Sequence, residues 1–168
     1  MTDVSSPRPS GAALSDALAA LDVTRRTRRS TAQVVDALPP DALTTIPDGF
    51  SNHVLWNVGH LVVTMQALVY GLSGLPLGVP DDWVAGFRKG TAPQDGVAAA
   101  PYAEVRERFL SLPDRVEADL RAGAFCQYRE YTTTPGVTLS SVSDALRFNL
   151  FHEGLHLGTV LALRKSLG

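Results

Sequence analysis

Hydrophobic residues recur at helical spacing in four long segments of the chain, and glycine, proline and polar residues separate these segments. The first segment runs from about residue 11 to 38, with a candidate cap at Ser10 and a stop at the two prolines that follow, whose nitrogens cannot donate hydrogen bonds. The second begins after Ser51 or Asn52, either of which can cap it, and continues to Leu72. Both segments are predicted to be long helices.

A long crossover loop rich in glycine, proline and aspartate comes next, and the only helical turn expected in it lies at about residues 81–87. The third helix follows Pro101 and ends before Gly123, and Pro113 within it is expected to produce a kink. Residues 124–137 are predicted to form an extended loop or a short hairpin.

The fourth helix is predicted to start near Thr138 or Ser140 and to continue to about Lys165, with Ser141 and Asp144 spaced as a capping box. Four long helices with little strand signal predict an all-α protein, most economically a four-helix bundle. We expect one domain over residues 11–168, after a disordered tail at residues 1–10.

Composition excludes several classes of function. No apolar segment reaches the ~18 residues that span a bilayer, and no secretory signal is recognisable, so a protein without a membrane partner is expected. The 17 acidic residues outnumber the 15 lysines and arginines, which argues against a nucleic-acid partner.

The basic cluster at residues 25–29 is therefore interpreted as a solvated face that pairs with Glu104, Glu107 and Asp114. A weaker interpretation of the cluster is a site for the carboxylates of an anionic thiol cofactor. The single cysteine, Cys126, is expected to be a small buried side chain, and it fits a cytoplasmic location.

The sequence HEGLH at residues 152–156 has the H-E-x-x-H pattern of zinc proteases. His152 and His156 lie one helical turn apart on one face, so both imidazoles can hold the same ion. The proteases take a third ligand from further along the chain, but no His, Asp, Glu or Cys follows His156. A protease is therefore disfavoured.

A third ligand is available upstream at His60, which lies mid-way along the second predicted helix on an apolar face. A histidine in that position is more often a core residue bonded to a backbone carbonyl, and this alternative stays open. If the second and fourth helices pack together, three imidazoles meet inside the bundle. Gly59, Gly154 and Gly158 reduce helix propensity and are interpreted as sites of close contact between these two helices.

The sequences GFSNHVLWNVGHLVVT, FRKGTAP and LRFNLFHEGLHLGTVLAL resemble the DinB-like (damage-inducible) superfamily, including its YfiT-like relatives. The resemblance covers nearly the whole chain after residue 10. It implies a bundle of up-up-down-down type, a divalent metal ion, zinc or nickel, and a homodimer. Carried over residue by residue, it makes His60, His152 and His156 the metal ligands. Members with known activity transfer low-molecular-weight thiols such as bacillithiol or mycothiol, or are glutathione-like isomerases.

Four further residues are candidates for supporting roles. Glu153 is a weak candidate for a catalytic base, but a bond to a neighbour on the first or third helix is favoured. His53 is expected either to line the mouth of the site, as a fourth ligand, substrate contact or proton shuttle, or to cap its helix while exposed to solvent. Asn57 and Asn149 are expected to accept hydrogen bonds from the ligand imidazoles and orient them, or to cap a loop.

The leading functional hypothesis is a metal-dependent enzyme that joins a small-molecule thiol to an electrophile. A metal-dependent hydrolase uses closely related chemistry and stays open. The third alternative is a non-catalytic metal-binding or stress-response protein. An open coordination position reached by a cleft would favour an enzyme over a structural metal site.

Overall fold

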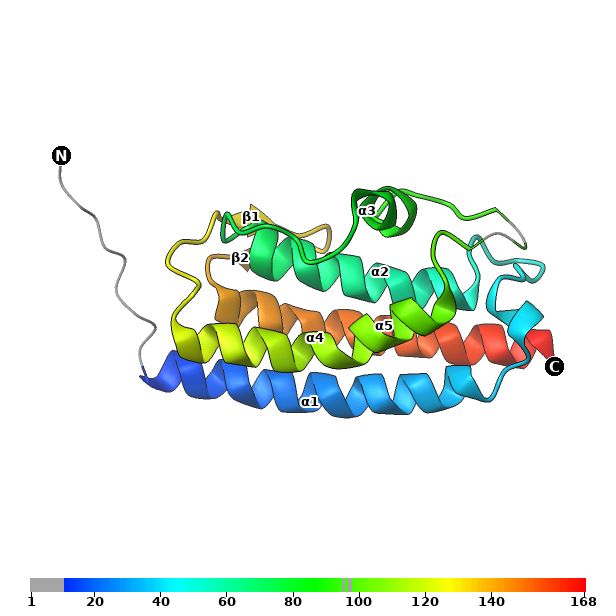
Figure 1. Cartoon of the computed structure of the whole chain (residues 1–168), viewed down its shortest axis with the longest axis horizontal. Helices are drawn as coiled ribbons and strands as arrows, with labels where there is room; N and C mark the ends of the chain where they lie inside the picture. Colours follow the sequence, from blue (N-terminus) through cyan, green and yellow to red (C-terminus); the bar gives the residue numbers. More distant parts are fainter. Residues whose placement is uncertain (1–10, 95, 97) are drawn as a thin grey trace.

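The computed structural model describes residues 11–94, 96 and 98–168, and Figure 1 shows its helices lying side by side along one long axis. The four long helices are α1 (Gly11–Asp36), α2 (Val54–Gln66), α4 (Tyr102–Ala122) and α5 (Val142–Leu167). Shorter elements are a 3₁₀ turn (Pro40–Leu43), a π turn that continues α2 (Ala67–Gly71), α3 (Asp81–Phe87), β1 (Tyr131–Thr132) and β2 (Thr138–Leu139). The predicted all-α bundle is confirmed, and the tail at residues 1–10, with the candidate cap Ser10, lies outside the described residues.

Each long helix packs against two others: α1 and α2 both contact α4 and α5. Traced by colour in Figure 1, α1 and α5 run in one direction and α2 and α4 in the other. The order is therefore up-down-down-up, and the expectation of up-up-down-down is wrong. The reason lies in the connections, because α1 joins α2 at one end of the bundle and the β1–β2 hairpin joins α4 to α5 at the other. The crossover between α2 and α4, which carries α3, covers the length of the bundle.

Local chemistry sets the helix ends. Ser141 caps α5, and its hydroxyl accepts a hydrogen bond from the backbone N–H of Asp144, as the capping box predicts. Gly123 ends α4 in the left-handed conformation, with φ +72°, which glycine adopts without steric cost. The helix passes through Pro113 without interruption, so the kink remains a prediction.

Three boundaries differ from the predictions. The first helix ends at Asp36 rather than 38. The second is capped by His53, not by Ser51 or Asn52, because the imidazole Nδ1 accepts the N–H of Trp56 at 3.0 Å. The fourth starts at Val142, since Thr138 and its neighbour pair with β1 in the hairpin that was one of the two predicted alternatives.

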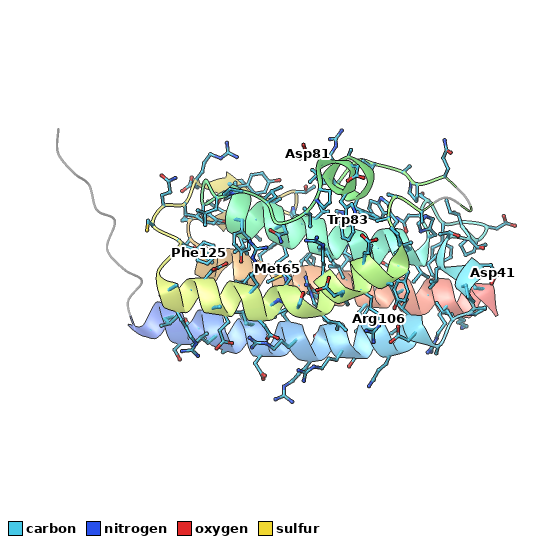
Figure 2. The ribbon with its side chains drawn as sticks, in the orientation of Figure 1. Asp41, Met65, Asp81, Trp83, Arg106 and Phe125 are labelled. Atoms are coloured by element: carbon cyan, nitrogen blue, oxygen red, sulfur yellow. The ribbon has the colours of Figure 1, made fainter. Side chains whose placement is uncertain are left out.

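The centre of the bundle is built on α2, in which every residue except Thr64 is buried. By length and composition Val54–Gly71 could cross a membrane, but 83% of it is buried inside the fold. This burial is what the core helix of a soluble bundle shows. Met65 lies among the packed side chains (Figure 2), and its sulfur accepts a hydrogen bond from Nη2 of Arg28 of α1 at 3.3 Å.

The basic cluster on α1 divides between surface and core. Arg25 pairs with Asp114 and Glu117 of α4, which confirms pairing with that helix, although Glu104 and Glu107 are not its partners. Arg28, which was expected to be solvated, is instead fully buried. Its position follows from helical spacing, because Arg28 falls on the same face as the buried residues Leu21 and Thr24.

Candidate metal centre

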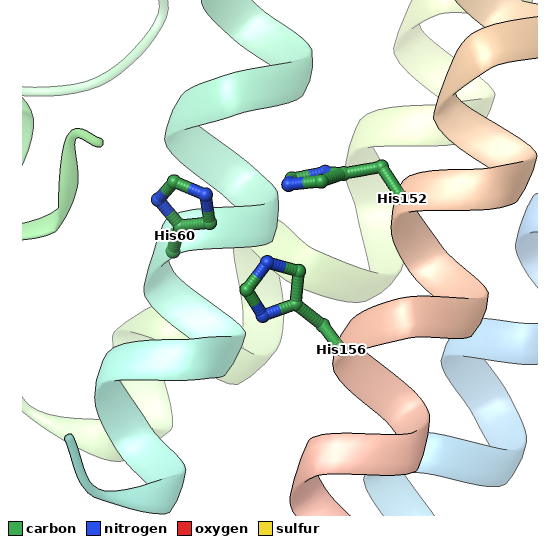
Figure 3. Close-up of side chains that lie close together, drawn as sticks. All are labelled: His60, His152 and His156. Carbon is green, nitrogen blue, oxygen red and sulfur yellow. The ribbon is translucent and has the colours of Figure 1, made fainter. Parts of the chain in front are cut away.

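Three imidazoles meet between α2 and α5. His60 projects from the middle of α2, and His152 and His156 project from successive turns of α5. One ligand atom from each lies within 4.8 Å of the others, and Figure 3 shows the three rings turned toward a common space. The ring centroids are 5.1 Å apart for His60 and His152, 4.9 Å for His60 and His156, and 4.6 Å for the two on α5.

Two of the rings are held by acceptors on their outer nitrogens. His60 Nδ1 lies 2.7 Å from the carbonyl oxygen of Phe87, and His156 Nδ1 lies 2.8 Å from Oδ1 of Asn57. Both acceptors require an N–H at Nδ1, so Nε2 is the nitrogen whose lone pair can bind an ion. At His60 this Nε2 also lies 3.3 Å from the hydroxyl oxygen of Thr64. Asn57 has the orienting contact expected for it.

The orientation of the Asn57 amide is itself determined. Its Nδ2 donates to Oδ1 of Asn52 at 2.8 Å and to the backbone oxygen of His53 at 3.0 Å. The amide oxygen therefore faces His156. The loop before α2 thus fixes one ligand of the site through a chain of hydrogen bonds.

Gly59 brings the carbonyl of Phe87 within reach of His60. A Cβ atom at residue 59 would lie 2.5 Å from the Phe87 ring, so only glycine lets α3 pack this closely on α2. The expectation that Gly59, Gly154 and Gly158 mediate contact between α2 and α5 is wrong. Gly59 faces α3, and a Cβ atom at Gly154 or Gly158 would have no neighbour within 4 Å.

Burial lowers the pKa values of all three imidazoles, which favours the unprotonated form. Burial lowers the pKa of His60. Burial, together with the two neighbouring imidazoles, lowers the pKa of His152 to about 3. Burial and His60 lower the pKa of His156 to about 4. All three rings are neutral at pH 7, and neutral imidazole is the form that binds metal.

Aromatic rings enclose the site. The indole of Trp56 stacks on His60 at 4.7 Å, and its Nε1 donates to the backbone oxygen of Gly86 and to Thr91. Phe148 stacks on His152, with the two ring centroids 6.5 Å apart. Beside Trp56 lies a hollow of about 370 Å³, also lined by His53, Phe87 and Thr91. Its volume suits a small molecule.

His60 is only 5% exposed, whereas His152 and His156 are partly exposed. The pair on α5 is therefore closer to solvent than His60 is. Three neutral imidazoles are a known protein donor set for a divalent ion such as zinc.

Glu153 does not lie with the histidines. Its side chain is buried on the adjacent face of α5, toward α1, and pairs with Arg28 of α1 at 2.7 Å. The favoured structural interpretation of Glu153 is thus supported, and its contacts give no support to a catalytic role. Asn149 was expected to orient an imidazole, but its Nδ2 donates to Glu153 Oε1 at 3.1 Å instead.

Two other expectations change. His53 does cap α2, but it is fully buried rather than exposed to solvent. It lines the hollow beside Trp56, so a substrate contact remains a prediction for it.

Cys126 was expected to be a small buried side chain, but it is exposed.

Phe87 has a role at the site that sequence reasoning did not identify. The group that holds His60 is its backbone carbonyl, which every residue carries. The only available signal was the short helix predicted at 81–87, because a helix beside α2 must bring some carbonyl groups near it.

Sequence comparison agrees with this geometry. A family model described as the DinB superfamily matches residues 24–160, which include all three histidines and parts of all four long helices. No curated protein matches the chain. Because the matched range covers most of the chain and contains the whole histidine cluster, the chain belongs to the DinB superfamily.

Proposed function

We propose that this protein binds a divalent metal ion, zinc or nickel, through His60, His152 and His156, and that it transfers a low-molecular-weight thiol to an electrophilic small molecule. The observation that carries the proposal is the convergence of three neutral imidazoles from two helices, one of them buried and two partly exposed. His₃ sites with an open position are typical of catalytic rather than structural zinc.

Residues around the histidine cluster orient the imidazoles toward the position that an ion would occupy. Phe87 and Asn57 orient His60 and His156 through their Nδ1 atoms, so that the Nε2 atoms face the shared space. Trp56 stacks on the ring of His60 and Phe148 on the ring of His152. A bound divalent ion would supply a Lewis acid that lowers the pKa of a thiol, so that the thiolate is available at neutral pH.

The thiol has to come from a substrate. Cys126, the one cysteine of the chain, is exposed after the end of α4 and lies 3.4 Å from the Gly123 oxygen, outside the histidine cluster. The hollow beside Trp56 is large enough for a small molecule and lacks charged side chains. We therefore propose that an uncharged part of a substrate occupies this hollow. A reducing cytoplasm, which keeps small thiols reduced, is the location that suits this reaction.

Metal content tests the ligand set. Protein purified with zinc or nickel should carry about one equivalent of ion, and His60→Ala, His152→Ala and His156→Ala should each lose most of it, because two imidazoles leave a divalent ion under-coordinated. The measurement is elemental analysis after gel filtration. Full retention by His60→Ala would remove that residue from the site.

His53→Asn is the matched control, because it removes the fourth histidine of the chain while asparagine still provides a helix cap. It should keep its metal. Circular dichroism of every variant establishes that any loss of metal is not a loss of fold.

Activity requires a separate screen. Small thiols are combined with electrophilic acceptors, with and without added zinc or nickel, and rates are compared with His152→Ala. A metal-dependent rate of thioether formation supports the proposal. Hydrolysis of the acceptor without thiol consumption would favour a hydrolase, and no rate above that of the variant would favour a non-catalytic metal-binding protein.

A further inference from the structure

The turn that follows α3 is anchored to the histidine cluster on both sides of Lys89. On one side, the carbonyl oxygen of Phe87 lies 2.7 Å from Nδ1 of His60. On the other side, the indole Nε1 of Trp56, whose ring stacks on His60, donates a hydrogen bond to the hydroxyl of Thr91 at 3.0 Å. Because both anchors lie close to Lys89 in the chain, they fix its backbone relative to the cluster.

Hydrogen bonds within the turn define its shape. The N–H and the hydroxyl of Thr91 both donate to the carbonyl oxygen of Arg88, at 3.2 Å and 2.8 Å. Gly90 has φ +84°, the left-handed conformation that favours glycine in a turn. The side chain of Lys89 is exposed, and its ammonium group donates a hydrogen bond to the hydroxyl of Thr134 in the β1–β2 hairpin.

The contact between Lys89 and Thr134 connects segments that cover different helices. α3 packs on α2, whereas β2 packs on α5, and both segments lie on the same side of the bundle in Figure 1. Thr134 belongs to a turn in which the N–H of Thr133 donates to the carbonyl of Val137, and the N–H of Gly136 to that of Thr133, both at 2.9 Å. Two ordered turns therefore hold the ammonium group of Lys89 beside the helices that carry the three histidines.

The charge of Lys89 is not balanced by a described acidic side chain. The ion pairs formed among the described residues do not include it, and its hydrogen-bond partner is a neutral hydroxyl. The charge is felt at the cluster: burial is the main cause of the lowered pKa of His60, the hydrogen bond to Phe87 opposes it, and the positive charge of Lys89 lowers this pKa further. Lys89 is therefore close enough to act electrostatically on a molecule bound at the histidines.

The immediate surroundings of the three imidazoles carry no negative charge to offset a cation. Within the described part of the chain, the rings contact aromatic side chains, a backbone carbonyl, an amide and a hydroxyl, which belong to Trp56, Phe148, Phe87, Asn57 and Thr64. Glu153, the acid next to His152 in the chain, pairs with Arg28 instead. Neutral imidazoles leave the charge of a divalent ion uncompensated, so the ion and Lys89 would together favour an anion at the cluster.

We propose that the substrate of this site carries a carboxylate group and that Lys89 binds it. The inference rests on the function proposed above and adds the chemical class of the substrate. An ammonium group is a compact charge with three donors, so Lys89 can bind a carboxylate oxygen and keep its hydrogen bond to Thr134. Neither turn has to move, and such preorganisation favours binding.

Two surface hollows beside the contact offer room for the rest of the substrate. The hollow of about 370 Å³ is lined by Phe87 and Thr91, on either side of Lys89 in the chain. A second hollow, of about 510 Å³, is lined by Pro135, next to the hairpin contact, and by Phe148. Either the thiol or its electrophilic acceptor can supply the carboxylate, so the experiment includes both sources.

Four small molecules of matched size separate the effect of the carboxylate from that of the thiol. 3-Mercaptopropionate and 3-mercaptopropionamide differ in the charged group alone, and butyrate and butyramide are the same pair with a methyl group in place of the thiol. Isothermal titration calorimetry at pH 7 measures the binding of each to the zinc-loaded wild type and to Lys89→Met, which has a neutral side chain of similar length. Because binding is measured, turnover is not required.

The wild type should bind the acid of at least one pair about tenfold more tightly than the amide, as one charge-assisted hydrogen bond contributes. Lys89→Met should lose this preference, whereas Lys89→Arg, which keeps the positive charge, should retain most of it. A preference in the thiol pair alone assigns the carboxylate to the thiol, and one in the butyrate pair alone assigns it to the acceptor. A preference in both pairs means that Lys89 binds the anion whichever substrate carries it.

Lys165→Met is the matched control, because it removes the same charge near the end of α5, about 13 Å along the helix from His156. It should keep the preference of the wild type. The zinc content of Lys89→Met should equal that of the wild type, since Lys89 is not a ligand. Any change in binding is then not a loss of the ion.

Equal binding of acid and amide by the wild type, or a preference that survives in Lys89→Met, would overturn the inference. The proposed function is judged separately. If both thiols bind without a preference, thiol transfer stands and the role of Lys89 is rejected. If butyrate shows a preference that depends on Lys89 but neither thiol binds, the anion site stands and the thiol is rejected as a substrate. Binding of none of the four molecules would overturn both.

Discussion

Arg28 and Glu153 form an ion pair that is closed to water. Oε1 of Glu153 accepts from Nε and Nη2 of Arg28 and from Asn149, and Arg28 Nη1 donates to the backbone oxygen of Phe109 at 2.8 Å. The pair joins α1, α4 and α5 at one point. Because Glu153 follows His152 directly, it also limits the rotation of α5 about its own axis, and so helps keep both α5 histidines turned toward α2.

Removing one partner of this pair should cost much more than removing both. Glu153→Leu leaves the Arg28 guanidinium buried without its counter-charge, for which about 3 to 5 kcal/mol is expected, whereas Arg28→Met combined with Glu153→Leu replaces two charges by apolar groups. Urea unfolding of the two variants and the wild type measures the difference. If Glu153→Leu is as stable as the double variant, the pair does not fix α5 as described.

At the level of elements, the site depends on how closely α3 packs on α2. Gly59 provides the space for the Phe87 ring, and the carbonyl of Phe87 then orients His60. The crossover between α2 and α4 thus places α3 against the histidine cluster. The glycine is needed for contact with α3, although its place in α2 had suggested contact with α5.

Gly59→Ala should lower both stability and metal affinity. The new Cβ would lie 2.5 Å from the Phe87 ring, and such overpacking typically costs about 1 to 3 kcal/mol. Thermal unfolding and zinc titration measure the two effects. Gly71→Ala is the matched control at the end of the same helical stretch, because its Cβ would lie 3.5 Å from Leu77 in ordinary contact. Equal behaviour of the two variants would show that α3 does not hold His60.

The whole bundle should lose stability in acid because of the histidine cluster. The unfolded chain binds protons at its histidines below the usual pKa of about 6.5, but the folded protein keeps His152 and His156 neutral until about pH 3 to 4. The unfolded state therefore binds more protons between these limits, and the free energy of unfolding falls as the pH falls from about 6.5 to 4.

Urea unfolding of the metal-free protein, followed between pH 7 and 4, measures this dependence. His152→Gln combined with His156→Gln should have a shallower dependence, since two of the groups that titrate in the unfolded state are gone. Identical slopes for wild type and variant would mean that these imidazoles are protonated as readily in the folded state as in the unfolded one.

Patterns within single segments were enough to predict the helices. The spacing of apolar residues located all four long helices, the capping box at Ser141 and the stop at Gly123 located two of their ends, and the spacing of His152 and His156 placed two imidazoles on one face. These features depend on contacts within a few residues, and the chemistry of those residues is visible in the chain.

Contacts between distant segments required the folded structure. Arg28 and Glu153 are 125 positions apart. The sequence placed Arg28 on a solvated face, and for Glu153 it favoured a bond to the first or third helix but could not name the partner. The helix directions, the partner of Gly59 and the carbonyl that holds His60 depend on which helices become neighbours. Packing determines those neighbours, because the same amphipathic helices can bury their apolar faces in more than one order, and periodicity along the chain does not distinguish between them.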